Sequence, residues 1–422
     1  MSDWKNRTVK SIAYFNPAES IATGKLVKKI PMGCLQTFTR KIVGYEIAKY
    51  KSGPKFRNGD TLLSKITPCL ENGKTAYVDI LDEEEVAFGS SEYIVLRARD
   101  KRDSLFLYYL AVSPTFRKRA ISCMEGTSGR KRVNENVLKY YDMLIPDLLT
   151  RNKIALALSS FDSKIELNNR INAELEAMVK ILYNYWFVQF DFPDKNGKPY
   201  KSSGGKMVYS DKLKRKIPEG WGVLLLDDVI TRSGTGLNPR DNFKLGSGNN
   251  FYVTIKNIDN GKIILDNRCD KVDDEALNII NQRSDLRPGD VLFTSIEPVG
   301  VTYLLQEKPT NWNINESVFT LRPNFEKITS EYLFMLLSST EMKAFTKNVS
   351  AGSIHKGVRH GVLKTFKLPY GQKSLIDDFS KILSPILKKI DKLDKENQKL
   401  VEFRDWLLPM LMNGQVRAHG AS

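Results

Sequence analysis

The chain has few histidines and cysteines, the residues on which many metal sites and disulfide-bonded secreted proteins depend. Its 422 residues include only three histidines and four cysteines, and no two cysteines form a Cys-x-x-Cys pair. Scattered cysteines are typical of reduced thiols, and so few histidines disfavour a histidine-based metal site. No apolar run reaches the roughly 18 residues of a membrane-spanning helix, and the N-terminal stretch MSDWKNRTVK is too polar for a secretory signal. These absences predict a cytoplasmic protein that holds no metal and does not enter a membrane.

The motifs of DNA-modifying enzymes are also missing. No Gly-rich turn of the FxGxG kind follows a predicted strand, as an adenosylmethionine site would require. The Asn-Pro pairs at Asn16 and Asn238 lack the following aromatic residue with which amino-methyltransferases hold a flipped base. The acidic run at 82–85 is contiguous, which is typical of a solvated loop rather than a metal site. We therefore expect a non-catalytic protein without a cofactor of its own.

What the chain does have is positive charge and length. Its formal net charge is +16, and 422 residues suffice for two or three domains. Such an excess of lysine and arginine favours a polyanionic partner, either nucleic acid or an acidic membrane surface.

The stretch GDTLLSKITP at 59–68 leads into Gly73-Lys74-Thr75, which resembles part of a phosphate-binding loop. The position five residues before Gly73, where that loop needs a glycine, is Pro68, which has no backbone N–H to donate. The alternative is a hairpin with strands over 60–66 and 75–80 and a turn at Asn72-Gly73. We favour the hairpin.

The same stretch recurs as GDVLFTSIEP at 289–298. SEYIVLR at 91–97 is likewise answered by ESVFTLR at 316–322, at an offset of 225 residues. About the same offset relates the amphipathic segments 105–120 and 331–346, and the Gly-rich basic loops 125–138 and 350–363. It also relates two strands that end at Pro146 and Pro369, and two helical segments around Leu175 and Leu400. The simplest account is one α+β unit written twice, each copy followed by a long helix.

Apolar residues spaced alternately by four and three predict that the two long helices pair along a narrow seam. The predicted seam residues are Phe161, Ile165, Asn172, Leu175 and Leu182 in the first helix, and Ile386, Ile390, Leu393, Asn397 and Leu400 in the second. Asn172 and Asn397 occupy equivalent positions, where a polar pair can fix the register. The alternative is that each helix only caps its own domain, with both asparagines facing water. Ser384-Pro385 predicts the start of the second helix, and Pro409 with Asn413-Gly414 predicts its end.

Basic residues in the two Gly-rich loops are the main candidates for DNA contact. The loop of the first copy carries Arg130, Lys131 and Arg132, with Asn134 and Asn136 beside them, and the predicted helix before it ends with Arg117, Lys118 and Arg119. The loop of the second copy carries His355, Lys356, Arg359 and His360. Further candidates elsewhere in the two domains are Arg40, Lys41, Lys65, Arg232 and Lys256. Lysine and arginine attract phosphates, arginine can read guanine, and asparagine can read adenine. The alternative is a pair of solvated loops without a ligand.

The chain resembles the specificity subunits of type I restriction–modification systems. The resemblance rests on FRNGDTLLSKITPCLENGKTA (56–76), YNYWFVQFDFPDKNGKPYKSSGGKMV (183–208), IPEGW (217–221) and LLPMLMNGQV (407–416). It covers essentially the whole chain. It implies two target-recognition domains that each read half of a bipartite double-stranded DNA site, and two helical regions packed as an antiparallel coiled coil.

The resemblance also implies partners: two methyltransferase subunits and the restriction subunits, which carry adenosylmethionine, ATP and magnesium, while this subunit carries no catalytic residue. The expected organisation is recognition domain 1 (1–149), a helical spacer (150–188), a connector (189–218), recognition domain 2 (219–370), a second helical spacer (371–413) and a tail (414–422). Two other functions stay open: a stand-alone nucleic-acid-binding protein, or a methyltransferase or nuclease whose catalytic motifs are unrecognised.

Overall fold

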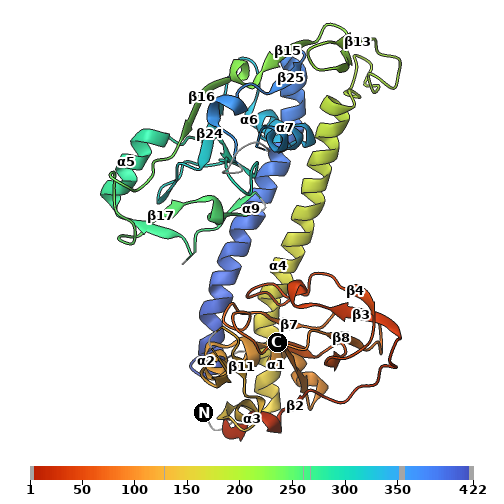
Figure 1. The fold of residues 1–422 in the computed structure, drawn as a ribbon, viewed down its shortest axis with the longest axis vertical. Coiled ribbons are helices and arrows are strands. Elements are labelled where there is room, and N and C mark those ends of the chain that lie inside the picture. The colour runs from red at the N-terminus through yellow and green to blue at the C-terminus, as the bar shows by residue number, and fades with distance from the viewer. Residues whose placement is uncertain (1–3, 128, 260, 267, 351–356, 418–422) are drawn as a thin grey trace. The chain divides into compact units, whose positions relative to one another are not determined.

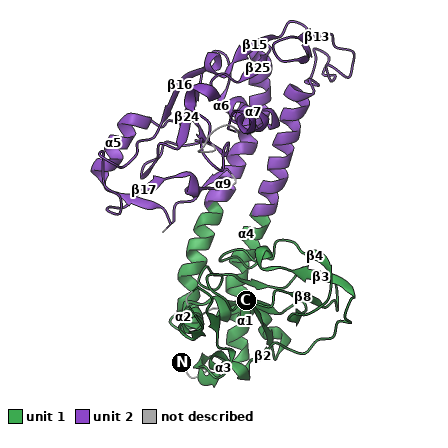
Figure 2. Cartoon of the chain, in the orientation of Figure 1, with its two compact units in different colours: residues 1–168, 396–422 green, residues 169–395 purple. Residues whose placement is uncertain are grey.

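The computed structural model describes residues 4–127, 129–259, 261–266, 268–350 and 357–417 (Figure 1). It divides into two compact units: unit 1 comprises residues 1–168 and 396–422, and unit 2 comprises residues 169–395 (Figure 2). Each unit combines a globular α+β part with a section of both long helices, which confirms the predicted fold class.

The main sheet of unit 1 contains the predicted hairpin. Four antiparallel strands follow the order β2 (Ala13–Phe15), β9 (Tyr93–Ala98), β6 (Thr61–Ser64) and β7 (Thr75–Tyr77). Strands β6 and β7 pair directly, so the hairpin is confirmed and a phosphate loop is excluded at this place. A second sheet has the order β4 (Glu46–Lys49), β3 (Leu26–Ile30), β8 (Ala87–Gly89) and β5 (Lys55–Phe56).

The main sheet of unit 2 repeats this strand order. It consists of β16 (Ile230–Thr235), β24 (Val318–Pro323), β21 (Val291–Thr294) and β22 (Thr302–Leu304). The two Gly-Asp stretches therefore form equivalent strands, β6 and β21, and every residue of both strands is buried. A three-stranded sheet accompanies it, in the order β20 (Asp270–Val272), β17 (Asn250–Val253) and β23 (Trp312–Ile314).

Short helices and two-stranded sheets complete each unit. Unit 1 adds β1 (Lys5–Thr8) paired with β12 (Asp142–Ile145), α1 (Ser104–Val112), α2 (Pro114–Ser122), β10 (Met124–Glu125) paired with β11 (Arg132–Val133), and α3 (Glu135–Lys139). Unit 2 adds β13 (Met207–Ser210) with β14 (Arg215–Pro218), β15 (Gly222–Leu225) with β25 (Lys367–Tyr370), β18 (Ile258–Asp259) with β19 (Lys262–Ile263), α5 (Asp274–Ser284), α6 (Ser330–Ser338), α7 (Thr340–Ser350) and α8 (His360–Leu363).

The long helices are α4 (Leu148–Tyr183), of 36 residues, and α9 (Lys373–Met412), of 40 residues. The carboxylate of Asp147 accepts a hydrogen bond from the N–H of Thr150 at 2.8 Å and so caps the start of α4. The predicted start of the second helix at Ser384-Pro385 is wrong, because α9 begins at Lys373. Pro385 lacks one helical N–H, but Phe379 and Leu383 are fully buried in the core of unit 2, and this packing keeps the preceding turns helical.

Polar pairs occupy the helix seam within each unit. In unit 1, Asn168 donates a hydrogen bond to Asn397 Oδ1 at 2.9 Å. In unit 2, Asn172 donates to Asp394 Oδ1 at 2.7 Å. The predicted asparagines are thus buried in the seam, but they do not pair with each other. The antiparallel course of the helices places each of them opposite a residue other than its repeat mate.

The predicted seam residues are all buried or half-buried. Asn172, Leu393 and Asn397 are buried, and no other predicted seam position is fully exposed. Leu182, Ile386 and Ile390 pack against the core of unit 2. The half-buried members at the remaining positions are Phe161, Ile165, Leu175 and Leu400. The helices therefore pair as the apolar spacing predicted, with part of the seam left uncovered.

Candidate nucleic-acid interface

The repeated Gly-Asp stretch supplies a buried ion pair in both units. In unit 1, Arg97 on β9 donates two hydrogen bonds of 2.7 Å to Asp60, which also accepts a hydrogen bond from the backbone N–H of Arg57. In unit 2, Arg322 on β24 grips Asp290 at 2.7 and 2.8 Å. The carboxylate cross-links neighbouring strands, which explains why Gly-Asp and Leu-Arg recur together.

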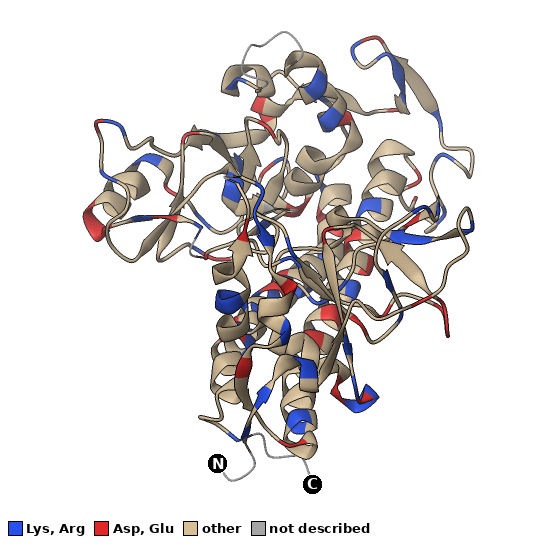
Figure 3. Ribbon diagram, turned by 60° about the horizontal axis from the view of Figure 1, so that its bottom comes forward, with Lys and Arg blue, Asp and Glu red and all other residues tan. Residues whose placement is uncertain are grey.

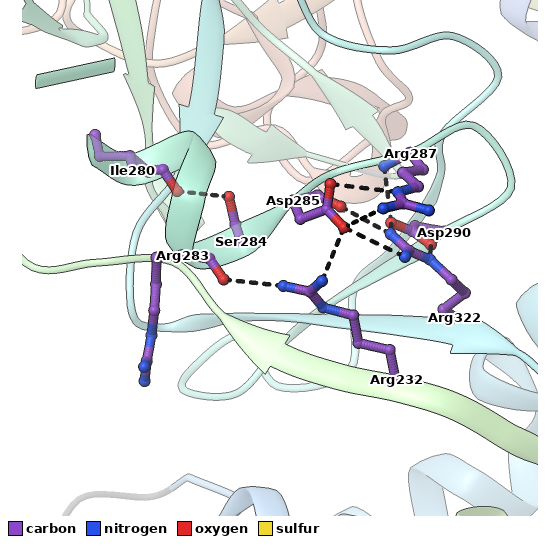
Figure 4. A network of polar contacts seen from close by, with 8 residues as sticks. All are labelled: Arg232, Ile280, Arg283, Ser284, Asp285, Arg287, Asp290 and Arg322. Carbon is purple, nitrogen blue, oxygen red and sulfur yellow. Dashed lines mark hydrogen bonds and ion pairs between the residues drawn. The ribbon is translucent and has the colours of Figure 1, made fainter. Parts of the chain in front are cut away.

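Unit 2 extends this pair into the network drawn in Figure 4. Asp285 accepts hydrogen bonds from Arg232 at 2.8 Å and from Arg287 at 3.3 Å. Partial burial opposes ionisation of this carboxyl, but the hydrogen bond from Arg287 and the charges of Arg287, Arg232 and Arg322 hold the pKa of Asp285 below its usual value. Arg232, a predicted DNA contact, therefore has an acidic partner inside the protein.

The Gly-rich basic loop of unit 1 packs against the end of the repeated strand. Ile66 forms a bridge with Arg132, and the N–H of Val133 donates to Lys65 O at 2.8 Å. Thr67 and Lys131 exchange two hydrogen bonds of 3.1 Å. The structure therefore brings the predicted residues Lys65 and Arg130–Arg132 together.

Most of the cations on this loop are open to solvent. Arg130 and Lys131 are exposed, and within the described ranges neither has an acidic partner. Arg132 is held by Glu92 at 2.7 and 2.9 Å, a contact that lowers the pKa of Glu92. Lys65 lies 3.7 Å from Glu135. Arg130 and Lys131 are thus the two exposed cations of this loop that no described acidic residue holds.

In unit 2, the end of the equivalent loop also pairs with the residues that follow the repeated strand, although the two loops differ in sequence. Ile296 forms a bridge with Gly357, and the N–H of Val358 donates to Ser295 O at 2.8 Å. His355 and Lys356 lie outside the described residues. Arg359 is exposed at the start of α8.

The remaining predicted contacts are distributed over both units. Lys118 and Arg119 are exposed on α2, and the Arg119 guanidinium lies 5.3 Å from the centre of the Tyr141 ring. Asn136 is exposed, while Asn134 caps α3 by accepting the N–H of Asn136 at 3.1 Å. Lys256 is exposed in a short turn of unit 2. All of these stay predictions as DNA contacts.

Arg40 and Lys41 bind the long helix. Arg40 is only 9% exposed and donates to Glu166 of α4 at 3.0 Å. Lys41 lies 2.7 Å from Asp79 and 3.7 Å from Glu166. Unit 2 has a similar contact between Lys262 and Asp394 of α9 at 2.6 Å. No local sequence pattern indicates these acidic partners, because each lies far along the chain from its cation.

His360 differs from the cation that the sequence predicted. Its ring packs edge-on against Phe319 with centroids 5.1 Å apart, and its Nε2 is buried without a hydrogen-bond partner. Burial, helped by the charge of Lys364, lowers the pKa of His360 below its usual value. Burial therefore favours the neutral form of the imidazole over the charged form.

This burial predicts a pH dependence. Because the folded pKa of His360 lies below the unfolded value, its contribution to stability is present above about pH 6.5 and is lost as the pH falls. We expect the unfolding midpoint to fall between pH 7 and pH 5. His360→Phe, which keeps an aromatic ring against Phe319, should flatten that part of the profile. An unchanged slope in this variant would show that His360 does not titrate as described.

Charged residues of both signs are distributed over the described structure (Figure 3). Figure 3 shows lysine and arginine interspersed with acidic residues over the loops and helices. Among the residues that the structure describes, no three His, Cys, Asp or Glu side chains come together as metal ligands. No helix in the described ranges is long and apolar enough to cross a membrane.

Comparison with known proteins gives a consistent result. A family model described as the type I restriction modification DNA specificity domain matches residues 1–177 and 218–402. The type I restriction enzyme HindI specificity subunit of Haemophilus influenzae is 23% identical, over 99% of this chain and 100% of the relative. The MjaIX specificity subunit of Methanocaldococcus jannaschii is 24% identical, over 74% of this chain and 69% of the relative.

A solved structure shares the fold. The S subunit of a type I restriction-modification system from M. genitalium superposes with a TM-score of 0.59 at 16% identity, covering 97% of this chain and 96% of that one. Two matches to one specificity domain agree with the two sheets of identical strand order. The chain therefore belongs to the family of type I restriction–modification DNA specificity subunits.

Proposed function

We propose that this chain is the non-catalytic specificity subunit of a type I restriction–modification enzyme and that its two units read the two halves of a split DNA site. The observation that carries this proposal is the repetition of one strand framework with different basic loops. The framework residues Asp60 and Asp290 are equivalent, whereas the loops at 125–138 and 350–363 share few residues. Equivalent scaffolds with different surfaces suit two different half-sites.

In this proposal, recognition domains 1 (1–149) and 2 (219–370) contact double-stranded DNA. The paired helices act as a spacer between the two half-sites. Linking two readers makes the second contact intramolecular, so affinity rises when the half-sites have the matching separation. The length of the unread DNA thereby becomes part of the specificity.

The proposed protein partners are two methyltransferase subunits and the restriction subunits. Each unit exposes its own apolar helix residues: Leu156, Phe403 and Trp406 in unit 1 are 66%, 58% and 59% exposed. In unit 2, Met178 and Ile181 are 53% and 68% exposed. Apolar side chains of this size in water favour protein contact. One such surface per unit suits two copies of one partner.

Catalysis is assigned to the partners. Adenosylmethionine, ATP and magnesium are proposed to bind the methyltransferase and restriction subunits, and the assembled enzyme is proposed to act in the cytoplasm.

The proposal predicts a specific effect of the exposed loop cations. Replacing Arg130 and Lys131 together by alanine should weaken DNA binding by the complex with the methyltransferase. If both contact phosphates, the slope of log affinity against log salt should fall by roughly 2, about 0.9 for each contact. The measurement is a salt titration of binding to a duplex that carries the split site.

The matched control changes Lys388 and Lys389 to alanine. Both are exposed on α9, so the control removes the same charge from a helix and leaves both basic loops unchanged. An equal fall in slope for both double variants would show that net charge, rather than the loop, sets the affinity.

A further inference from the structure

One exposed aromatic residue of unit 1 is held in an unusual backbone conformation. Phe38 has φ +53° and is 54% exposed. A bulky side chain rarely adopts a positive φ, because its Cβ then crowds the backbone. The conformation is imposed by neighbouring backbone: the N–H of Phe38 donates to Gly73 O at 3.1 Å, and Thr37 forms a bridge with Lys74.

Two further contacts orient the ring of Phe38. A Cβ at Gly73 would lie only 2.6 Å from Phe38 Cε1, so the glycine leaves room for the ring to pack on its backbone. The Arg117 guanidinium carbon lies 4.7 Å from the ring centre. Arg117 itself is tied down by donating to Glu71 O at 3.1 Å. The ring is therefore held in place while more than half of the residue faces solvent.

The surroundings of the ring are the predicted DNA contacts. Phe38 and Arg117 contact one end of the turn 67–73, at Gly73 and Glu71. At the other end of this turn, Thr67 is hydrogen-bonded to Lys131 of the Gly-rich basic loop. Lys118 is exposed beside Arg117 on α2. A fixed aromatic ring at the edge of a cationic surface fits a nucleic-acid base, whose flat face can stack on it.

We propose that Phe38 is a stacking contact to DNA, entering a base step beside the half-site that unit 1 reads. This inference rests on the proposed function and deepens it. Apolar side chains that enter a base step unstack it and make binding depend on how easily that step deforms. Phe38 thereby contributes to specificity without a hydrogen bond to a base edge. The surrounding cations hold the phosphates on either side.

The test uses the complex with the methyltransferase subunit and a duplex containing its split site, with 2-aminopurine placed at successive positions that flank the unit 1 half-site. Phe38→Asn and Phe38→Gly both tolerate a positive φ and so keep the backbone. We expect roughly 5- to 100-fold weaker binding, an unchanged salt slope and loss of the fluorescence increase that reports an unstacked base. Phe38→Tyr keeps the ring and should restore all three readouts.

The matched control is Ile47→Asn, which removes an apolar side chain that is 61% exposed on β4 of the same unit. It should bind DNA like the unmodified complex. Equal binding and fluorescence for Phe38→Asn and the unmodified protein would overturn the inference. So would a lower unfolding midpoint for Phe38→Asn and Phe38→Gly, or loss of methyltransferase binding without DNA. A complex that recognises no split site at all would overturn the proposed function as well.

Discussion

Replacing Asp60 or Asp290 by alanine is expected to lower the free energy of unfolding by about 3 to 5 kcal/mol in each case. Asp60 is 1% exposed and Asp290 is fully buried. Each carboxylate is the partner of a largely buried arginine, Arg97 or Arg322, whose side chains are 14% and 15% exposed. Removing the carboxylate takes away the partner that accepts two hydrogen bonds from the guanidinium, and leaves Arg97 with Glu19 and Arg322 with Asp285 as the remaining acidic partners. Such a loss is a large part of the roughly 5 to 15 kcal/mol that stabilises a typical domain.

The measurement is chemical denaturation of the complete chain, with each variant compared with Asp100→Ala. Both carboxylate oxygens of Asp100 also accept hydrogen bonds from an arginine, Arg102, but the Arg102 side chain is 67% exposed. Water screens an exposed pair, so this control should cost far less. Similar losses for the exposed and the buried pairs would contradict the framework role of the repeated Gly-Asp stretch.

Shortening both long helices by seven residues is the second large perturbation. Removing 169–175 from α4 and 391–397 from α9 takes no residue from the hydrophobic core of either unit, keeps the seven-residue periodicity of the seam and shortens the rod by about 10.5 Å. That length equals about three base pairs at 3.4 Å each. We expect methylation of the original site to fall roughly 100-fold or more, because only one half-site can then be engaged at a time.

The same variant should gain a site whose unread spacer is about three base pairs shorter. A control keeps the helix length and changes exposed positions in the same segments, such as Glu174 and Lys392, to alanine. This control should methylate the original site. Undiminished methylation of that site by the shortened protein would show that the helices do not set the spacing.

Much of the architecture was accessible from the sequence because it is repeated. Gly-Asp and Leu-Arg recur at nearly constant offset, and the structure shows them as one buried ion pair built twice. The seam of the long helices also followed from spacing, since burial of apolar side chains at that period requires a second helix.

Other features depended on contacts that no local pattern records. Pro385 looked like a helix start, but packing of the preceding turn in the core of unit 2 overrides that local preference. Asn172 and Asn397 are equivalent in sequence, yet their partners are set by the antiparallel course of the helices. The acidic partner of Arg40 is 126 residues away, so charge alone could not separate this tether from a DNA contact.

The central claim is that one chain reads two half-sites at a fixed separation. Its most direct test is to express the chain with its methyltransferase subunit in a host that lacks the modification and to map every methylated base in the genome. The account predicts a split motif, two specific half-sites around an unread spacer of constant length, and only when both proteins are present. A continuous motif, or methylation by this chain alone, would contradict it.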